Sequence, residues 1–167
     1  MKNLADTIIH IKKALPTDVS LLTSLIRDSF KDVAERFGLS AENCPKHPSN
    51  STDEWIEKDL ARGVIYYILE KDGNPVGCAA IEPASNDVCY LERLAVLPNE
   101  RGNGYGRALV TNVLLKAKTL GAQEVGIGII ADHTELKEWY RKIGFIEGDT
   151  NDFKHLPFRV TFMKYEL

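Results

Sequence analysis

The sequence lacks a long apolar run and has no excess of basic residues. No apolar stretch approaches the ~18 residues that a transmembrane helix requires. Lysine and arginine total 21 against 24 aspartates and glutamates, and the formal net charge of -3 leaves no basic footprint for nucleic acid. We therefore expect neither a membrane nor a nucleic acid among the partners of this protein.

Cysteine is scarce as well. The three cysteines, Cys44, Cys78 and Cys89, are odd in number and have no C-x-x-C spacing, which argues against a disulfide framework. The N-terminus does not resemble a signal peptide, because Asp6 and Lys12 interrupt its short apolar run. Together these features predict reduced thiols and a cytoplasmic protein.

The composition that remains is that of an ordinary globular domain. Of the 167 residues, 44% are hydrophobic and 27% are charged. There are no internal repeats, low-complexity segments or linkers, so we expect residues 1–167 to form one domain. A chain of this length buries enough surface to fold without a disulfide or a structural metal.

Residues 91–107 carry the strongest signal. The first half, L-E-R-L-A-V-L-P, predicts a strand that ends at Pro98, because proline cannot donate a hydrogen bond to a sheet. The second half, R-G-N-G-Y-G-R, is a glycine-rich turn that opens a helix running to about Leu120. The first N–H groups of a helix are unpaired and lie at its positive end. With Arg101 and Arg107 beside them, they predict a phosphate or pyrophosphate site.

The rest of the chain alternates strands and helices. We expect strands over residues 7–13, 64–70, 75–82, 124–131, 145–148 and 158–165, and helices over about 17–37, 52–62 and 134–143. Helices that cross between strands, together with hairpins, imply a mixed sheet in an α/β layer architecture.

Residues 39–51 form an irregular segment rich in proline, asparagine and serine. The segment either lies over a substrate cleft or is a plain connector. It contains a C-x-x-H pair, Cys44 and His47, but no second pair follows that would complete a metal site. No metal is therefore expected.

The spacing of the glycines separates the known phosphate loops. A dinucleotide fingerprint fails because Arg107 stands where the third glycine belongs, and the P-loop spacing fails too. The string R-G-N-G-Y-G instead matches R/Q-x-x-G-x-G/A, the acetyl-CoA motif of the GNAT acetyltransferases. The preceding L-x-x-L-A-V-x-P and the later Y-R-K-I-G-F also resemble that superfamily. A tight turn without a ligand is the alternative, but it does not explain the paired arginines or Tyr140.

The resemblance covers the chain well from about Val64 onward and only in outline before that. It implies a central, splayed mixed sheet flanked by helices, with acetyl-CoA as co-substrate. It also implies that the backbone of Leu94, Ala95 and Val96 pairs with the pantetheine arm like an added strand. The turn residues expected to bind acetyl-CoA are Arg101, Gly102, Asn103, Gly104, Tyr105, Gly106 and Arg107.

Two positions depart from the family pattern. Members often have the pattern N-x-x-A-x-x-x-Y, which ends at their tyrosine. This chain has His133 in place of the asparagine and Leu136 in place of the alanine. His133 either replaces the asparagine contact to CoA or is simply exposed.

Acetyl transfer to an amine needs an acid for the leaving thiolate, and Tyr140 is the expected acid. It lies four residues before Gly144 in W-Y-R-K-I-G-F, where the family places a tyrosine near the CoA sulfur. A phenol is neutral at pH 7 and can donate to the thiolate as it forms. The alternative is a half-buried helix tyrosine packed beside Trp139.

The reaction also needs a base for the amine, and Glu92 is the expected base, directly or through a water. Alternation along the strand places Glu92 on the same face as Tyr90, Leu94 and Val96. A carboxylate among apolar neighbours has a raised pKa, which suits a base that works near neutral pH. The alternative is an ion pair with Arg93 or another cation.

The predicted function is therefore transfer of an acetyl group to a primary amine of a small molecule, by direct attack in a ternary complex. A non-catalytic acyl-CoA-binding or sensor module is one alternative, and acetylation of protein lysines or N-termini is another. We expect the acceptor to be set by residues 30–55 and by the loop before Phe158. The candidate contacts are Phe30, Cys44, His47 and Trp55. A homodimer is compatible with the sequence.

Overall fold

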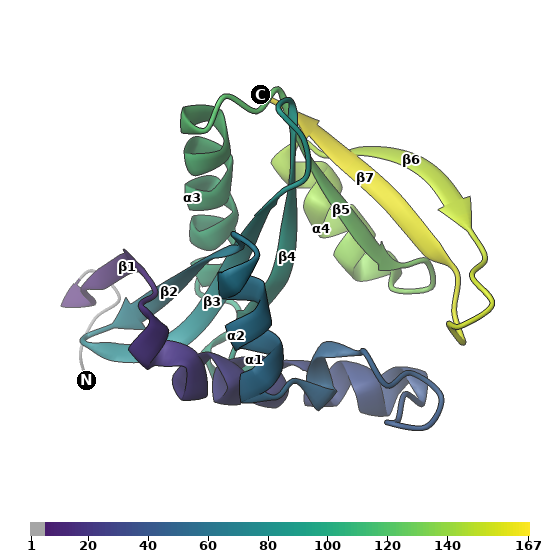
Figure 1. Ribbon diagram of the computed structural model, residues 1–167, viewed down its shortest axis with the longest axis horizontal. Coiled ribbons are helices and arrows are strands. Elements are labelled where there is room, and N and C mark those ends of the chain that lie inside the picture. The colour runs from purple at the N-terminus through teal and green to yellow at the C-terminus, as the bar shows by residue number, and fades with distance from the viewer. Residues whose placement is uncertain (1–5) are drawn as a thin grey trace.

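The structure is a computed structural model that describes residues 6–167, and it contains a seven-stranded mixed sheet covered by helices on both faces (Figure 1). The order of strands is β1-β2-β3-β4-β5-β7-β6. The strands are β1 (Ile9–Lys13), β2 (Ile65–Lys71), β3 (Asn74–Pro83), β4 (Val88–Val96), β5 (Glu124–Ile130), β6 (Ile146–Asn151) and β7 (Val160–Glu166). The helices are α1 (Val19–Phe37), α2 (Asp53–Ala61), α3 (Tyr105–Thr119) and α4 (Thr134–Ile143).

The predicted mixed sheet is confirmed, and each expected strand and helix is present with ends shifted by a few residues. Local signals explain the ends. Gly38 ends α1 at φ 64°, and the Thr52 side chain accepts a hydrogen bond from the backbone N–H of Trp55 at the start of α2. The expectation about a signal peptide concerns the N-terminal segment, of which residues 1–5 lie outside the described residues.

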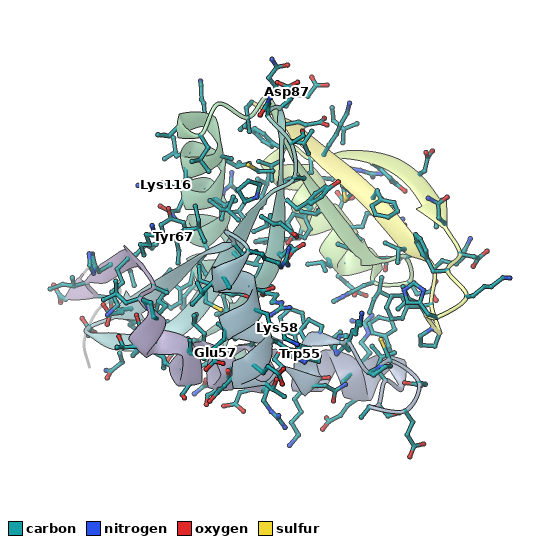
Figure 2. All side chains as sticks on the ribbon, in the orientation of Figure 1. Trp55, Glu57, Lys58, Tyr67, Asp87 and Lys116 are labelled. Atoms are coloured by element: carbon teal, nitrogen blue, oxygen red, sulfur yellow. The ribbon has the colours of Figure 1, made fainter. Side chains whose placement is uncertain are left out.

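The two faces of the sheet have separate cores. On one face α1 and α2 pack against β2 and β3, with Leu22, Ile26 and Ile56 fully buried. On the other face α3 packs against β3, β4 and β5 around Leu109 and Val113, while Lys116 of α3 points away from the sheet (Figure 2). Each such buried side chain contributes about 1.5–3 kcal/mol.

Two further sequence expectations concern membranes and disulfides. Among residues 6–167, no helix is both long and apolar enough to cross a bilayer. The three cysteines are all buried and form no disulfide. Burial raises the pKa of the Cys78 thiol to about 12, so this thiol stays protonated at neutral pH.

The sheet splays between β4 and β5. These two strands run parallel, and they pair only where Val88–Tyr90 lie opposite Glu124–Gly126. Beyond Tyr90 the strands diverge (Figure 1), so β4 has a strand partner on its β3 side only. The sheet therefore opens a wedge at its centre while its outer strands remain hydrogen-bonded.

A bulge in β4 corrects one prediction. Glu92 pairs with Ala80 and Ala95 pairs with Cys78, so Ala79 lies opposite two residues, and Arg93 takes a φ of 51°. Because the extra residue reverses the alternation, Glu92 faces α1 and α2. Leu94 and Val96 face α3. The prediction that Glu92 shares a face with Leu94 and Val96 is wrong.

Candidate active site

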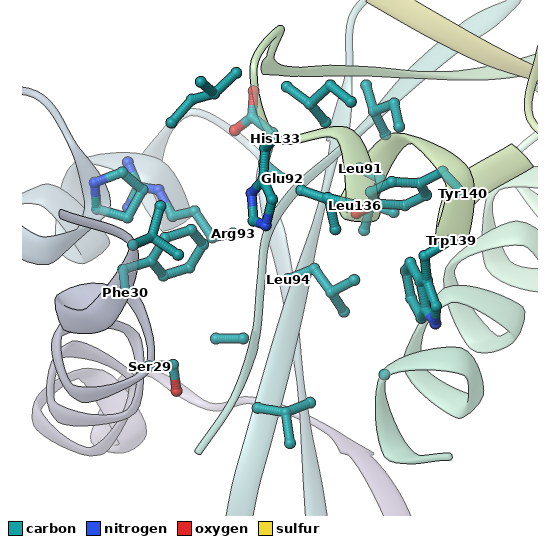
Figure 3. Close-up of a pocket in the computed structure, with 18 of the residues that line it drawn as sticks. Ser29, Phe30, Leu91, Glu92, Arg93, Leu94, His133, Leu136, Trp139 and Tyr140 are labelled. Carbon is teal, nitrogen blue, oxygen red and sulfur yellow. The ribbon is translucent and has the colours of Figure 1, made fainter. Parts of the chain in front are cut away.

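A cavity of about 1140 Å³ occupies the wedge between the diverging strands. Its walls come from α1, residues 47–48, β4 from Tyr90 onward, the turn at residues 100–107, β5, α4 and β7. Figure 3 shows Phe30 on the α1 side, Trp139 and Tyr140 on the α4 side, and Leu94 of β4 between them. The volume exceeds that of a typical pocket for one drug-sized ligand, so it can hold two substrates.

The glycine turn forms one end of this cavity. Gly102 and Gly104 both have a φ of 82°, a backbone conformation that favours glycine. Within residues 6–167, no hydrogen bond occupies the N–H groups of Tyr105, Gly106 and Arg107 at the start of α3. Three unpaired donors at a helix N-terminus are suited to binding an anion.

Gly106 has a different role from the two glycines before it. A Cβ at Gly106 would lie 3.3 Å from the Trp139 ring, whereas a Cβ at Gly102 or Gly104 would meet nothing within 4 Å. Gly106 therefore allows α3 to approach α4. Asn103 lies outside the cavity wall, and its side-chain amide donates to the Glu100 carbonyl, which stabilises the turn.

The two arginines of the turn differ in the structure. The Arg101 guanidinium is held by three hydrogen bonds. It donates to the Asp32 carboxylate at 2.6 Å, to the Ser29 carbonyl at 2.6 Å and to the Val96 carbonyl at 3.1 Å. The hydrogen bond from Arg101 holds the pKa of the Asp32 carboxyl below its ordinary value. Arg107 is exposed on the cavity wall and has no ion pair among residues 6–167. Both arginines line the cavity, so their binding of the ligand stays a prediction, and Arg101 in addition fastens the turn to α1 and β4.

The open edge of β4 forms the floor of the cavity. Leu94, Ala95 and Val96 line it, and no strand pairs with them from the β5 side. An extended ligand can add to such an edge through backbone hydrogen bonds. The Val96 carbonyl already accepts from Arg101, so this carbonyl marks where the open edge meets the turn.

Tyr140 lies on α4 and lines the cavity although its side chain is almost entirely buried. Its ring packs edge-on against Trp139 and Phe145, with centroid distances of 4.9 and 5.2 Å. Burial raises the pKa of the phenol above its ordinary value. The hydroxyl has no hydrogen-bond partner in the described part of the chain, so it remains a protonated donor for a ligand in the cavity.

Glu92 lines the cavity from β4. Burial raises the pKa of its carboxyl to about 8, and a hydrogen bond with the Glu82 carboxyl, together with the negative charge of Glu82, adds to the shift. From the sequence we attributed the raised pKa of Glu92 to apolar neighbours. In the structure the nearby Glu82 carboxyl is a further cause. The alternative, an ion pair between Glu92 and Arg93, is not formed, and the Arg93 guanidinium pairs with Asp59 instead.

Behind Glu92 lies a network of polar side chains in which Asp59 and Tyr66 are buried, Glu82 and Arg93 are half-buried and Arg62 is exposed. We call these five residues the Asp59 cluster. The Asp59 carboxylate accepts from the Tyr66 hydroxyl at 2.5 Å and from Arg62 at 2.9 Å, and it pairs with Arg93 at 3.0 Å. Arg93 also donates to the Tyr66 hydroxyl at 2.9 Å, and Arg62 pairs with Glu82. The cluster joins α2, β2, β3 and β4 on one face of the sheet.

Of the four residues that we expected to contact the acetyl acceptor, two line the cavity and two do not. Phe30 and His47 line the cavity with their rings 5.8 Å apart, edge to face. Cys44 is buried and does not line the cavity. Trp55 of α2 (Figure 2) lies beneath the Arg93 guanidinium at 5.8 Å and is also absent from the cavity wall.

His133 sits on the cavity wall at the N-terminus of α4, with its ring 5.4 Å from that of Phe37. Burial lowers the pKa of this imidazole, and the positive charge of Arg36 adds to the effect. The ring is therefore neutral near pH 7. Residues 6–167 contain no group of three or more histidine, cysteine or acidic side chains placed to hold a metal ion.

Several cavity residues were not identified from the sequence. They are Ser29 on α1, Arg93 on β4, Trp139 on α4, and Val160 and Phe162 on β7. Trp139 could have been found, since it precedes Tyr140 on one turn of helix. Nothing in the spacing marks the others, because the bulge and the distant strand β7 bring them to the cavity.

Comparisons with known proteins agree with this geometry. The model of the acetyltransferase (GNAT) family matches residues 26–145. An amino-acid acetyltransferase of Neisseria meningitidis strain MC58 is 28% identical over 141 residues, which cover 84% of this chain but 28% of that protein. The uncharacterized N-acetyltransferase YjgM of Escherichia coli is 24% identical over 148 residues, covering 87% of this chain and 86% of YjgM.

A solved structure shows the same fold. The PaiA N-acetyltransferase of Thermoplasma acidophilum, crystallised in complex with coenzyme A, superposes with a TM-score of 0.81 at 19% identity. The superposition covers 96% of this chain and 99% of that one. Because the family model matches most of the chain, this protein belongs to the acetyltransferase (GNAT) family.

Proposed function

We propose that this protein transfers the acetyl group of acetyl-CoA to a primary amine of a small molecule, by direct attack in a ternary complex. The observation that carries the proposal is that one cavity contains the glycine turn, the open edge of β4, Glu92 and Tyr140. The name of the Neisseria relative, an amino-acid acetyltransferase, supports a small-molecule acceptor.

The turn and β4 would hold the acetyl donor. The N–H groups of Tyr105, Gly106 and Arg107 would bind the pyrophosphate, and the Arg107 guanidinium would add a charge-assisted hydrogen bond. The backbone of Leu94 and Ala95 would pair with the pantetheine arm. These contacts direct the thioester along β4 toward the middle of the cavity.

Glu92 and Tyr140 would then act as the base and the acid of the reaction. The Glu92 carboxylate removes one proton from the substrate ammonium, directly or through a water, and the amine nitrogen attacks the thioester carbonyl. The nitrogen then loses a second proton to water as the carbon–sulfur bond breaks, and the Tyr140 hydroxyl donates a proton to the departing thiolate. The products are an acetylated amine and free CoA, and solvent restores the protonation of the two side chains.

The test is release of free thiol from acetyl-CoA across a panel of amines, with the acetylated product identified by mass spectrometry. We expect at least one small amine to give both products in equal amounts. Lys58→Gln is the matched control, because Lys58 is an exposed residue of α2 that does not line the cavity. Binding of acetyl-CoA without product from any amine would contradict the proposal and favour a sensor module. Product from peptides alone would favour a protein substrate.

A further inference from the structure

Two neighbouring residues of β4, one with a carboxyl group and one with a guanidinium group, both reach the cavity. In a regular strand, residues 92 and 93 would face opposite sides of the sheet. The bulge at Arg93 changes this, so that Glu92 contacts Glu82 while Arg93 contacts Asp59 and Tyr66 on the same face. Both side chains line the cavity, beside the proposed site of acetyl transfer.

The Arg93 guanidinium is held in place but is only partly used. Its contacts with the Tyr66 hydroxyl and with Asp59 both involve Nη1. Within residues 6–167, no acceptor binds Nε or Nη2. Asp59 is shared with Arg62 and Tyr66, so Arg93 has no carboxylate bound to it alone, and its Nε and Nη2 donors stay open. A fixed guanidinium with open donors is suited to a carboxylate ligand.

His47 adds a neutral donor to the cavity wall, where its ring lies 5.8 Å from that of Phe30. Its Nδ1 accepts a hydrogen bond from the Ser49 backbone N–H at 3.3 Å and lies 2.7 Å from the Ser49 hydroxyl. In the neutral ring the proton is then on Nε2, and no residue in the described part of the chain accepts it. Burial lowers the pKa of His47, so the ring stays neutral near pH 7.

We propose that the acetyl acceptor is an α-amino acid, whose amine is directed to Glu92 and whose carboxylate binds Arg93 and His47. The proposal rests on the acetyltransferase function proposed above. In an α-amino acid the amine and the carboxylate are attached to one carbon, so the two groups match an acid and a cation on consecutive residues. The apolar wall formed by Phe30, Val160 and Phe162 is then left for the side chain of the amino acid.

The same geometry disfavours a peptide N-terminus. A peptide has a neutral amide where the free amino acid has its carboxylate. Binding it would shield the open Arg93 donors from water and give them a weaker, uncharged acceptor. A simple alkylamine has no group at that position at all.

The experiment compares each of the 20 common L-amino acids with its C-terminal amide and with the amine lacking the carboxyl group. Thiol release and mass spectrometry give kcat/KM for every member. We expect the best substrate to be an amino acid, preferred over its own amide and amine by about 10- to 100-fold. Equal values within twofold, or a preference for the amide or the amine, would overturn the proposal while leaving the acetyltransferase function intact.

Variants of Arg93 separate recognition from structural support. With Arg93→Gln we expect KM for the preferred amino acid to rise at least tenfold, while KM for its amide changes less than twofold. Arg93→Lys, which retains the charge near Trp55, should restore part of the lost affinity. Lys58→Gln should behave as the parent. Equal losses for the acid and the amide would assign Arg93 a structural role only and contradict the proposal.

Direct binding decides the matter even if no amine is acetylated. Saturation-transfer NMR on the CoA-loaded protein can compare the 20 amino acids with their amides without any reaction. Binding of an amino acid that is lost in Arg93→Gln, in the absence of turnover, would support this inference and contradict the proposed catalysis. Binding of neither compound, or of both equally, would overturn the inference.

Discussion

The two ends of the cavity differ in the chemical groups that line them: one presents mainly backbone groups and the other mainly side chains. The end that would hold acetyl-CoA is made mainly of backbone: the N–H groups at the start of α3 and the open edge of β4. The end that would hold the acceptor is made of side chains, which come from α1, residues 47–48, the bulge of β4 and strand β7.

This difference explains why sequence motifs predicted the residues of one end of the cavity and not those of the other. A backbone site needs glycines and a helix start at fixed spacing, and residues 101–107 supply all of it within one short stretch. A side-chain site needs residues that only the fold brings together: the guanidinium of Arg93 depends on Asp59 and Tyr66, which lie 34 and 27 residues away. The comparison predicts that changes at the donor end act on acetyl-CoA binding and changes at the acceptor end on chemistry and selectivity.

Tyr140→Phe should give the largest effect on rate. The substitution retains the packing against Trp139 and Phe145 and removes only an unpartnered hydroxyl, so the fold and the affinity for acetyl-CoA should persist. A group used mainly in the transition state affects kcat, and proton donation of this kind is worth about 10²–10⁴. Single-turnover measurements should show this loss without masking by product release. A single-turnover rate within twofold of the parent would remove Tyr140 from the mechanism.

Glu92→Gln should lower the rate by about 10² and change its pH dependence. In the parent, the rate should rise with pH until the carboxyl is ionised, with a midpoint near its pKa of about 8. The variant should lose that acidic limb. An unaltered profile at full activity would leave Glu92 as a structural carboxylate.

The stability of the same variant provides a second readout. The pKa of Glu92 lies above its ordinary value of 4.5, so the folded protein binds this proton more tightly than the unfolded chain does. The free energy of unfolding should therefore fall as pH rises from about 4.5 to 8, and Glu92→Gln should reduce that decline. Urea denaturation at several pH values measures it, and parallel curves for the two proteins would contradict the assigned shift.

Gly104→Ala should weaken acetyl-CoA binding about tenfold or more. The φ of 82° strains any other residue, by about 1–2 kcal/mol, and the strain shifts the N–H groups that face the cavity. Gly121→Ala is the matched control, because Gly121 has a φ of 89°, equally open surroundings and no place in the cavity wall. Both variants should lose similar stability, and calorimetry should show lost affinity in Gly104→Ala only. Equal affinities of the two variants for acetyl-CoA would mean that the pyrophosphate does not bind at this turn.

The fold followed from the sequence more fully than the site did. Apolar periodicity located the strands and helices, because this signal acts over neighbouring residues. Glycines at positive φ, at residues 38, 73, 121 and 144, stand at the ends of these elements. The bulge at Arg93 left no such signal: an arginine at positive φ is unusual, and it depends on the contacts of its side chain. The face of Glu92 was mispredicted for that reason, and the role of Arg93 was missed.

Arg101 and Asp32 should give the smallest effect. Both side chains are partly exposed, so the ion pair should contribute about 0.5–1 kcal/mol to stability. Arg101→Gln should also weaken acetyl-CoA binding less than Arg107→Gln does, since Arg101 anchors the turn while Arg107 faces the cavity. A double-mutant cycle with Asp32→Asn measures the coupling by urea denaturation. A coupling energy of zero between Arg101 and Asp32 would contradict the anchoring role of Arg101. A larger loss of acetyl-CoA affinity in Arg101→Gln than in Arg107→Gln, measured by calorimetry, would contradict it as well.

The most direct test of the whole account is a crystal structure of this protein with acetyl-CoA. We predict that the pyrophosphate lies within hydrogen-bonding distance of the backbone N–H groups of residues 105–107. The pantetheine arm should run along Leu94 and Ala95, and the thioester sulfur should lie within reach of the Tyr140 hydroxyl. Acetyl-CoA bound outside the wedge between β4 and β5, or with its sulfur remote from Tyr140, would contradict the account.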